Sequence, residues 1–220
     1  MSFEGFPDEG LVFYEGLEAD NSKTYWTQHK AAYEQHVRAP LQAMLEELAP
    51  EFGTAKVFRP YRDVRFSQDK TPYKTAQGAV ITPDGRGVGS WYVQVSADGL
   101  LVSGGCWRLE SDQIDRFRRA VADDVQGPRL QAEVDRLAGL GFDIHGERLT
   151  RVPSGYAADA PRADLLRHKS LHAGRHWEPA DWLHEREALE KVRAAWREVE
   201  NLNRWLAYNV GASAKEPRRR

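Results

Sequence analysis

Residues 90–102 read SWYVQVSADGLLV and carry the clearest structural signal in the chain. Apolar and more polar side chains alternate from Trp91 to Ser96, which is the period of a half-buried strand. The pair Asp98-Gly99 separates this run from a second apolar run, Leu-Leu-Val. An Asp-Gly pair between two such runs is a strong signal for a tight turn. The stretch therefore predicts an antiparallel hairpin near the middle of the chain.

The strand pattern extends to both sides of this hairpin. Residues 79–81 form a short apolar run before Pro83, which opens a turn signal. Gly104 and Gly105 come just past the second strand of the hairpin, where we expect a bulge or a close approach between backbones. We therefore expect residues 56–108 to form an antiparallel sheet of three to five strands.

Apolar residues recur at helical spacing before and after this region. The elements expected before it are a helix over 8–18, a second helix capped by Asn21 or Ser22 with a kink or a restart at Pro40, and a helical stripe over 41–48 ended by Pro50 and Gly53. The elements expected after it are a helix capped by Ser111, a helix over 130–137, a strand over 142–152, a short helix from Pro161 and a long helix over 185–207.

Helices, then strands, then helices predict an α+β fold rather than a doubly wound α/β fold. No linker-like segment divides the chain. We therefore expect a single domain over residues 1–212, with a central antiparallel sheet flanked by N-terminal and C-terminal helices. Residues 213–220 are expected to form a disordered basic tail.

Composition narrows the classes of function. With a net charge of −2 over 220 residues, the chain has no global field that would attract nucleic acid or an anionic membrane. The single cysteine, Cys106, cannot form an intramolecular disulfide, which favours a reducing compartment. The N-terminal sequence lacks the features of a signal peptide, and no apolar run has the length of a transmembrane helix. We expect a cytoplasmic protein without a membrane partner.

Residues 59–81, RPYRDVRFSQDKTPYKTAQGAVI, hold a local cluster of positive charge. Its bases are Arg59, Arg62, Arg65, Lys70 and Lys74. We expect the segment to begin as a strand, with Asp63 and Arg65 on one face, and to continue as a loop over residues 67–72. Arginine offers a rigid donor fork for phosphate or carboxylate, and lysine offers a mobile point charge. The hydroxyl groups nearby belong to Ser67, Thr71, Tyr73 and Thr75. The segment therefore predicts a cradle for an anion.

Three blocks of the chain resemble a known family. They are FPDEGLVFYEGLEADNSKTYWTQHKAAYE, then YRDVRFSQDKTPYKTAQGAVI with the WYVQV and GGCW that follow it, and GYAADAPRADLLRHKSL. On these blocks the chain is identified as a member of the domain of unknown function 2461 family, which is widespread in bacteria. The resemblance implies a single α+β domain and points to the second and third blocks. It implies no activity and no catalytic residue.

The third block adds Arg162, Arg167 and Lys169, which would make a pocket strongly cationic if the two blocks meet in space. The candidate ligand-binding residues are Arg62, Asp63, Arg65, Ser67, Asp69, Lys70, Tyr73, Lys74, Arg167 and Lys169. We expect no cofactor and no metal ligand among them.

The leading hypothesis is a protein that binds an anionic small molecule, with Arg65 as the orienting fork. Asp63 or Asp69 would hold that fork, or act as a general base if the protein is an enzyme, which stays open. One alternative is a nucleic-acid-binding module that uses the same cations with strand aromatics such as Trp91. The other is an interaction protein in which Asp63, Asp69 and Asp164 pair with the bases, so that the cluster is structural.

His168, His172 and His176 recur every four residues. On a helix they would line one face, where they could bind a transition metal. Gly174 disfavours a helix, and no acidic residue is interleaved among the three. Surface or capping histidines are therefore the favoured interpretation.

Overall fold

The computed structural model describes residues 2–65, 68–83 and 88–215. In chain order its elements are α1 (Asp8–Ala19), α2 (Lys23–Tyr33), η1 (Glu34–Arg38), α3 (Ala39–Phe52), β1 (Ala55–Val57), β2 (Ala76–Ile81), β3 (Ser90–Ser96), β4 (Gly99–Cys106), α4 (Ser111–Ala122), α5 (Gln126–Gly139), β5 (Asp143–His145), α6 (Ala163–Leu166), β6 (Leu171–Trp177), η3 (Asp181–His184), α7 (Glu187–Glu198) and α8 (Glu200–Asn209). The α+β class is confirmed.

The strands form one antiparallel sheet in the order β1-β2-β3-β4-β6-β5. The predicted hairpin is present as β3 and β4, and Gly99 takes the positive φ of 108° that its turn requires. Four strands lie between residues 55 and 106, within the range expected for this region. Gly104 and Gly105 lie inside β4 rather than past it, so that boundary was wrong.

The chain forms two compact units. The first contains Met1–Ile81, Tyr92–Val102 and His176–Ala194, and the second contains Thr82–Trp91, Ser103–Arg175 and Ala195–Arg220. Strands β3, β4 and β6 and helix α7 each contribute residues to both units. The prediction of one domain over residues 1–212 stays a prediction, and the units are described in turn.

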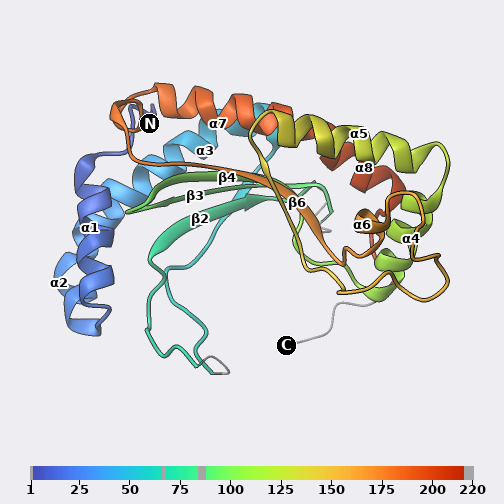
Figure 1. Ribbon diagram of the computed structural model, residues 1–220. Helices are drawn as coiled ribbons and strands as arrows, with labels where there is room; N and C mark the ends of the chain where they lie inside the picture. Colours follow the sequence, from blue (N-terminus) through green and yellow to red (C-terminus); the bar gives the residue numbers. More distant parts are fainter. Residues whose placement is uncertain (1, 66–67, 84–87, 216–220) are drawn as a thin grey trace. The chain divides into compact units, whose positions relative to one another are not determined.

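In the first unit, α1 and α2 lie side by side (Figure 1). Ser22 caps α2, because its hydroxyl oxygen accepts the backbone N–H of Tyr25 at 3.1 Å. The Tyr25 hydroxyl then donates to the carbonyl of Phe13 on α1 at 2.9 Å. Gly16 makes this approach possible, since a Cβ there would lie 2.1 Å from the Tyr25 hydroxyl oxygen. The two helices are thus joined by a direct contact between the start of α2 and the middle of α1.

Pro40 lies in the first turn of α3, where a missing N–H costs little. The helical irregularity expected at Pro40 takes the form of a π-helical turn, η1, which directly precedes α3. Pro50 was expected to end α3, and this was wrong, because Pro50 lies inside the last turn. The helix ends at Gly53, whose φ of 97° only glycine adopts readily.

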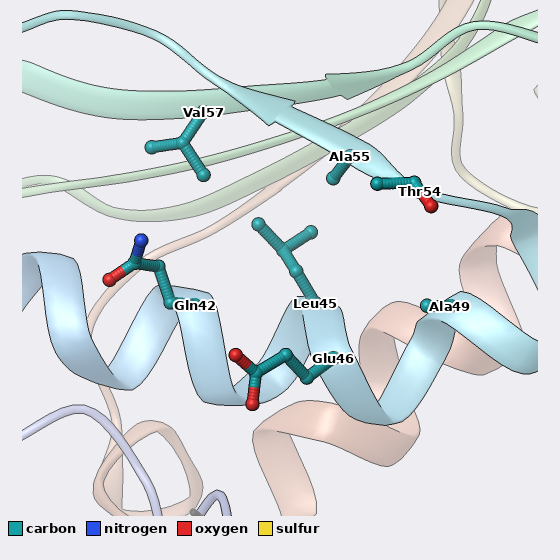
Figure 2. A pocket seen from close by; sticks show the side chains of 7 residues that line it. All are labelled: Gln42, Leu45, Glu46, Ala49, Thr54, Ala55 and Val57. Carbon is teal, nitrogen blue, oxygen red and sulfur yellow. The ribbon is translucent and has the colours of Figure 1, made fainter.

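A small cavity of about 170 Å³ lies between α3 and strand β1 (Figure 2). Leu45 and Val57 supply its larger apolar side chains. Ala49 and Ala55 help to leave the space open, because each side chain is a single methyl group. Its charged lining residue is the acid Glu46, which makes it a poor site for an anion.

In the second unit, α4, α5 and α8 pack around a buried core. Phe117 of α4 contacts Trp205 of α8, with the ring centroids 5.9 Å apart. The Trp205 indole N–H donates to the carbonyl of Gln126 on α5 at 3.0 Å. Large aromatic side chains stabilise such a core most when the polar end also finds a partner.

The helix expected over 185–207 is interrupted at Val199, which separates α7 from α8. Val199 packs directly on the backbone of Gly104 in β4, because a Cβ at Gly104 would lie 2.3 Å from a Val199 methyl group. The close approach expected at Gly104 is therefore present, although inside a strand. Helical spacing alone could not reveal the break, since the apolar stripe continues through it.

Two further boundaries differ from the expectation. Glu110 rather than Ser111 caps α4, because Glu110 and Gln113 form a reciprocal capping box. Residues 142–152 form only the three-residue strand β5 and one isolated bridge, between Arg148 and His168.

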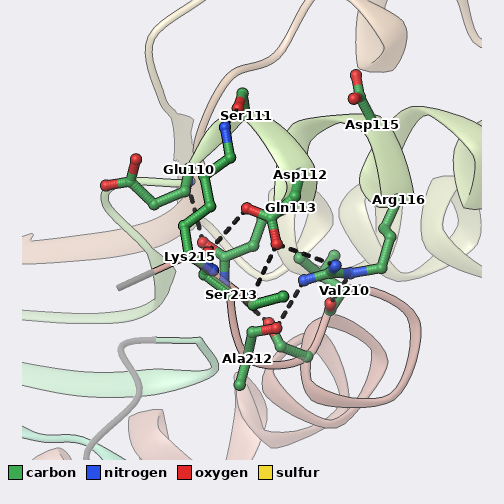
Figure 3. Close-up of polar contacts among 12 residues, drawn as sticks. Glu110, Ser111, Asp112, Gln113, Asp115, Arg116, Val210, Ala212, Ser213 and Lys215 are labelled. Carbon is green, nitrogen blue, oxygen red and sulfur yellow. Dashed lines mark hydrogen bonds and ion pairs between the residues drawn. The ribbon is translucent and has the colours of Figure 1, made fainter. Parts of the chain in front are cut away.

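The segment after α8 is bound to α4 (Figure 3). Arg116 donates to two backbone carbonyls of this segment at 2.6 and 2.7 Å. Asp112 accepts the Ser213 hydroxyl at 2.8 Å. Residues 216–220 lie outside the described residues, so the disorder expected for 213–220 stays a prediction.

Candidate functional site

The basic segment forms a loop that is closed at its neck by two tyrosines. Tyr61 and Tyr73 make an isolated antiparallel bridge. The expectation of a strand from Arg59 onward was wrong, because the described residues between Arg59 and Thr75 form no strand and pair only at this bridge. Pro60 and Pro72 flank the bridge and lack the N–H groups that would extend a ladder.

Helix α2 and the residue before its cap hold this neck in place. Asn21 exchanges two hydrogen bonds of 3.1 Å with the backbone of Tyr73. Trp26 stacks on the Tyr73 ring, with centroids 4.4 Å apart and an angle of 9° between the planes. Tyr73 is 5% exposed, so this candidate residue is buried at the neck of the loop and supports it. In Figure 1 the loop extends away from strand β2.

Two ion pairs lie within the loop. The Arg65 guanidinium donates to both oxygens of Asp63, at 2.9 and 2.7 Å. Arg62 pairs with Asp69 and also donates to the Thr71 hydroxyl at 2.6 Å. These are pairings that the structural alternative expects. Both pairs are partly exposed, so each adds little to stability.

Hydrogen bonds hold the two carboxylates of the loop in their charged form. The side-chain bond from Arg65 is the main cause of a pKa of Asp63 far below its ordinary value. The backbone and hydroxyl of Thr71, and then Arg62, lower the pKa of Asp69. A carboxylate with a lowered pKa is a weak general base, so neither acid is suited to that role in this arrangement.

The remaining candidates of the loop are Lys70, Ser67 and Lys74. The Lys70 ammonium donates to the carbonyl of Val64 at 2.9 Å and so supports the loop backbone. Ser67 lies outside the described residues. Lys74 instead lines a cleft together with Arg62.

We call this site the Lys74 cleft. It has a volume of about 450 Å³, and its lining residues are Phe58, Arg62, Lys74, Thr75, Ala76, Gly78, Tyr92 and Gln94. Two of these described residues are cations, and none is an acid. The Lys74 ammonium lies over the Phe58 ring, 5.2 Å from its centroid. Burial, followed by the charge of Arg59, lowers the pKa of Lys74.

The two cations of the cleft were among the candidate residues predicted from the sequence, whereas Phe58, Tyr92 and Gln94 were not. Tyr92 and Gln94 lie two residues apart on strand β3, so period-two alternation does place them on one face. Nothing local indicates that β2 brings Lys74 beside them, because the pairing of two strands is a nonlocal property. Phe58 carried no signal in the sequence.

The candidates of the third block lie in the second unit and have partners there. Arg167 donates to Asp164 at 2.7 Å, and Lys169 pairs with Glu147. Arg162 donates to the carbonyl of Val121 at 2.7 Å. Each of these bases is thus engaged within its own unit.

The three histidines do not share a helix. His172 and His176 lie on strand β6, and His168 precedes it. His172 lies between the rings of Trp107 and His145, at centroid distances of 5.3 and 5.6 Å. Across residues 2–65, 68–83 and 88–215, no three metal-ligating side chains gather in a group that could hold a metal ion.

Comparison with known proteins gives a family but no activity. A search of the curated proteins finds no match. Within the described residues, the helices are too short or too polar to cross a membrane. One family model, described as "Conserved hypothetical protein (DUF2461)", matches residues 9–205, which is most of the chain. The chain therefore belongs to the DUF2461 family, as its three sequence blocks predicted.

Proposed function

We propose that the protein binds a small anionic molecule in the Lys74 cleft, with Arg62 and Lys74 as its contacts. The observation that carries the proposal is the environment of Lys74. Its ammonium lies in a cleft without an acidic lining residue, and no carboxylate of the described chain forms an ion pair with it.

The energetics of Lys74 favour an anion. Burial disfavours the charged form of an amine, which is why the pKa of Lys74 is lowered. A phosphate or carboxylate beside the ammonium would restore the favourable interaction lost from water. Anion binding should therefore raise the pKa of Lys74 and stabilise the folded protein.

Arg62 is suited to orient such a ligand. Asp69 and Thr71 hold one terminal nitrogen of its guanidinium, so the side chain approaches the cleft in a fixed direction. Thr75 adds a hydroxyl group to the lining. Arg65 and Lys70 do not line the cleft, and their role as ligand contacts stays a prediction.

Thermal unfolding in the presence of candidate ligands tests the proposal. The panel contains nucleotides, sugar phosphates, dicarboxylates and short oligonucleotides, added to wild type, to Lys74→Gln and to the control Lys30→Gln on the exposed face of α2. A ligand at about a hundred times its Kd adds roughly 2.7 kcal/mol, or about 5–10 °C in Tm for a chain of this size.

We expect at least one small anion to raise the Tm of wild type and of Lys30→Gln but not of Lys74→Gln. Equal shifts in all three proteins, or none in wild type, would contradict the proposal. A response to oligonucleotides alone, with an affinity that falls steeply as salt rises, would instead support the nucleic-acid alternative.

A further inference from the structure

We infer that the anion bound by the Lys74 cleft carries a planar aromatic ring, which stacks against Tyr92. This inference rests on the proposed function and adds the chemical class of the ligand. It is carried by the two aromatic residues that line the cleft, Phe58 and Tyr92, which we call the aromatic wall. Neither residue belongs to the basic loop.

The ring of Tyr92 lies close to Gly78 of strand β2 because residue 78 has no side chain. A Cβ at Gly78 would lie 2.4 Å from the Tyr92 hydroxyl oxygen and 2.9 Å from two of its ring carbons. No real Cβ contact is that short, so any larger residue at position 78 would push the ring away. Gly78 therefore sets where the aromatic wall stands.

A hydrogen bond fixes the other end of the same ring. The Tyr92 hydroxyl donates to the side-chain oxygen of Gln94 at 2.7 Å. Because this bond uses the Gln94 oxygen, the two N–H donors of the Gln94 amide nitrogen remain for other acceptors. Among the described residues, no acceptor forms a hydrogen bond with this nitrogen. A ligand ring with an acceptor atom could use that donor.

The aromatic wall and the positive charge border one cleft. Phe58 lies 6.2 Å from the Tyr92 ring, centroid to centroid, and the Lys74 ammonium lies over Phe58. Burial raises the pKa of Tyr92 to about 12, so the phenol stays neutral and does not repel an anion. A ring placed against Tyr92 would thus carry its charged substituent toward Lys74 and Arg62.

The size of the cleft also favours a ligand larger than an inorganic anion. A volume of about 450 Å³ lies within the range of small-molecule sites, in which apolar walls surround a few polar groups. A bare phosphate would contact the cations and leave the aromatic wall in water. Stacking on that wall should tighten binding roughly three- to tenfold.

Matched pairs of probes isolate the contribution of the ring. Benzoate is compared with acetate, and phenyl phosphate with inorganic phosphate, by calorimetric titration of the full chain. We expect wild type to bind the ring-bearing member of each pair roughly three- to tenfold more tightly. Tyr92→Leu should lose most of this preference, whereas Tyr92→Phe should keep it.

A measurement on wild type alone covers the case in which Tyr92→Leu does not fold. The ring protons of bound benzoate should shift upfield in the NMR spectrum, because they lie over an aromatic face. Equal affinities within each pair, with no upfield shift, would overturn the ring inference and leave anion binding standing. If no probe of either pair binds, the proposed function fails as well.

Discussion

Removing one buried hydroxyl group should destabilise the fold directly behind the Lys74 cleft. Tyr33 and Gln77 are each 1% exposed, and the Tyr33 hydroxyl donates to the side-chain oxygen of Gln77 at 2.5 Å. The Gln77 amide nitrogen donates to the carbonyls of Phe58 at 2.7 Å and Gly78 at 3.0 Å. Phe58 and Gly78 both line the cleft, so this network holds two of its residues.

The substitution Tyr33→Phe keeps the ring and deletes the donor. The Gln77 oxygen is then buried without a hydrogen bond, which costs about 1–3 kcal/mol. For a chain of this length, that loss lowers the Tm by about 2–12 °C. Burial also raises the pKa of Tyr33 to about 12, which agrees with a phenol that stays neutral and donates.

Urea unfolding followed by circular dichroism measures the effect. The midpoint should fall while the slope stays unchanged, because the variant alters stability and not the surface exposed on unfolding. Tyr208→Phe is the matched control, since Tyr208 is 83% exposed, and it should change stability by less than about 0.5 kcal/mol. A loss for Tyr33→Phe no larger than that of the control would show that the Tyr33–Gln77 hydrogen bond does not stabilise the fold.

Three further outcomes are expected. Gly104→Ala should lower the free energy of unfolding in urea by about 1–3 kcal/mol, because the added methyl group overpacks β4. Gly139→Ala is the control, and it should be neutral or stabilising because nothing lies within 4 Å of the added Cβ. Equal effects of the two substitutions would contradict the packing described. Burial and its histidine neighbours lower the pKa of His172 to about 4, so the unfolded chain takes up a proton first and stability falls as the pH drops from about 6.5 to 4. In His172→Phe this part of the pH dependence of the urea midpoint should be missing, and its persistence would count against the assignment. Backbone and hydroxyl donors of the C-terminal segment lower the pKa of Asp112 to about 2, so this contact is complete above about pH 4 and is lost as the pH falls toward 2. Asp112→Ala should speed tryptic cleavage after Lys215 at neutral pH, and an unchanged rate would show that the contact does not hold the segment.

Local signals predicted the parts of the fold that local chemistry decides. The Asp98-Gly99 pair marked a hairpin because its conformation suits few other residues. Ser22 marked a helix start because its hydroxyl binds a backbone N–H within its own turn. The order of helices and strands then gave the fold class.

The misplaced boundaries have both nonlocal and local causes. Val199, where the last helix is interrupted, packs against Gly104, which lies far away in the sequence. The expected strand from Arg59 onward overlooked the two prolines that flank the Tyr61 bridge.

The sequence predicted the cations of the Lys74 cleft but not the other residues that line it. Arg62 and Lys74 stood out because bases are crowded in the loop. Tyr92 and Gly78 join them through strand pairing, which a single sequence does not specify. The acids of the loop prove to be partners of its arginines, so the part of the cluster that remains for a ligand is centred on Lys74.

If the Lys74 ammonium binds an anion in its cleft, the bound anion must change the protonation equilibrium of Lys74. The most direct test is the pKa of Lys74, read by NMR from selectively ¹³C-methylated lysines with and without benzoate. We expect a pKa below the ordinary lysine value of about 10.4 in the free protein, and a rise when benzoate binds. An ordinary pKa that benzoate leaves unchanged would contradict it.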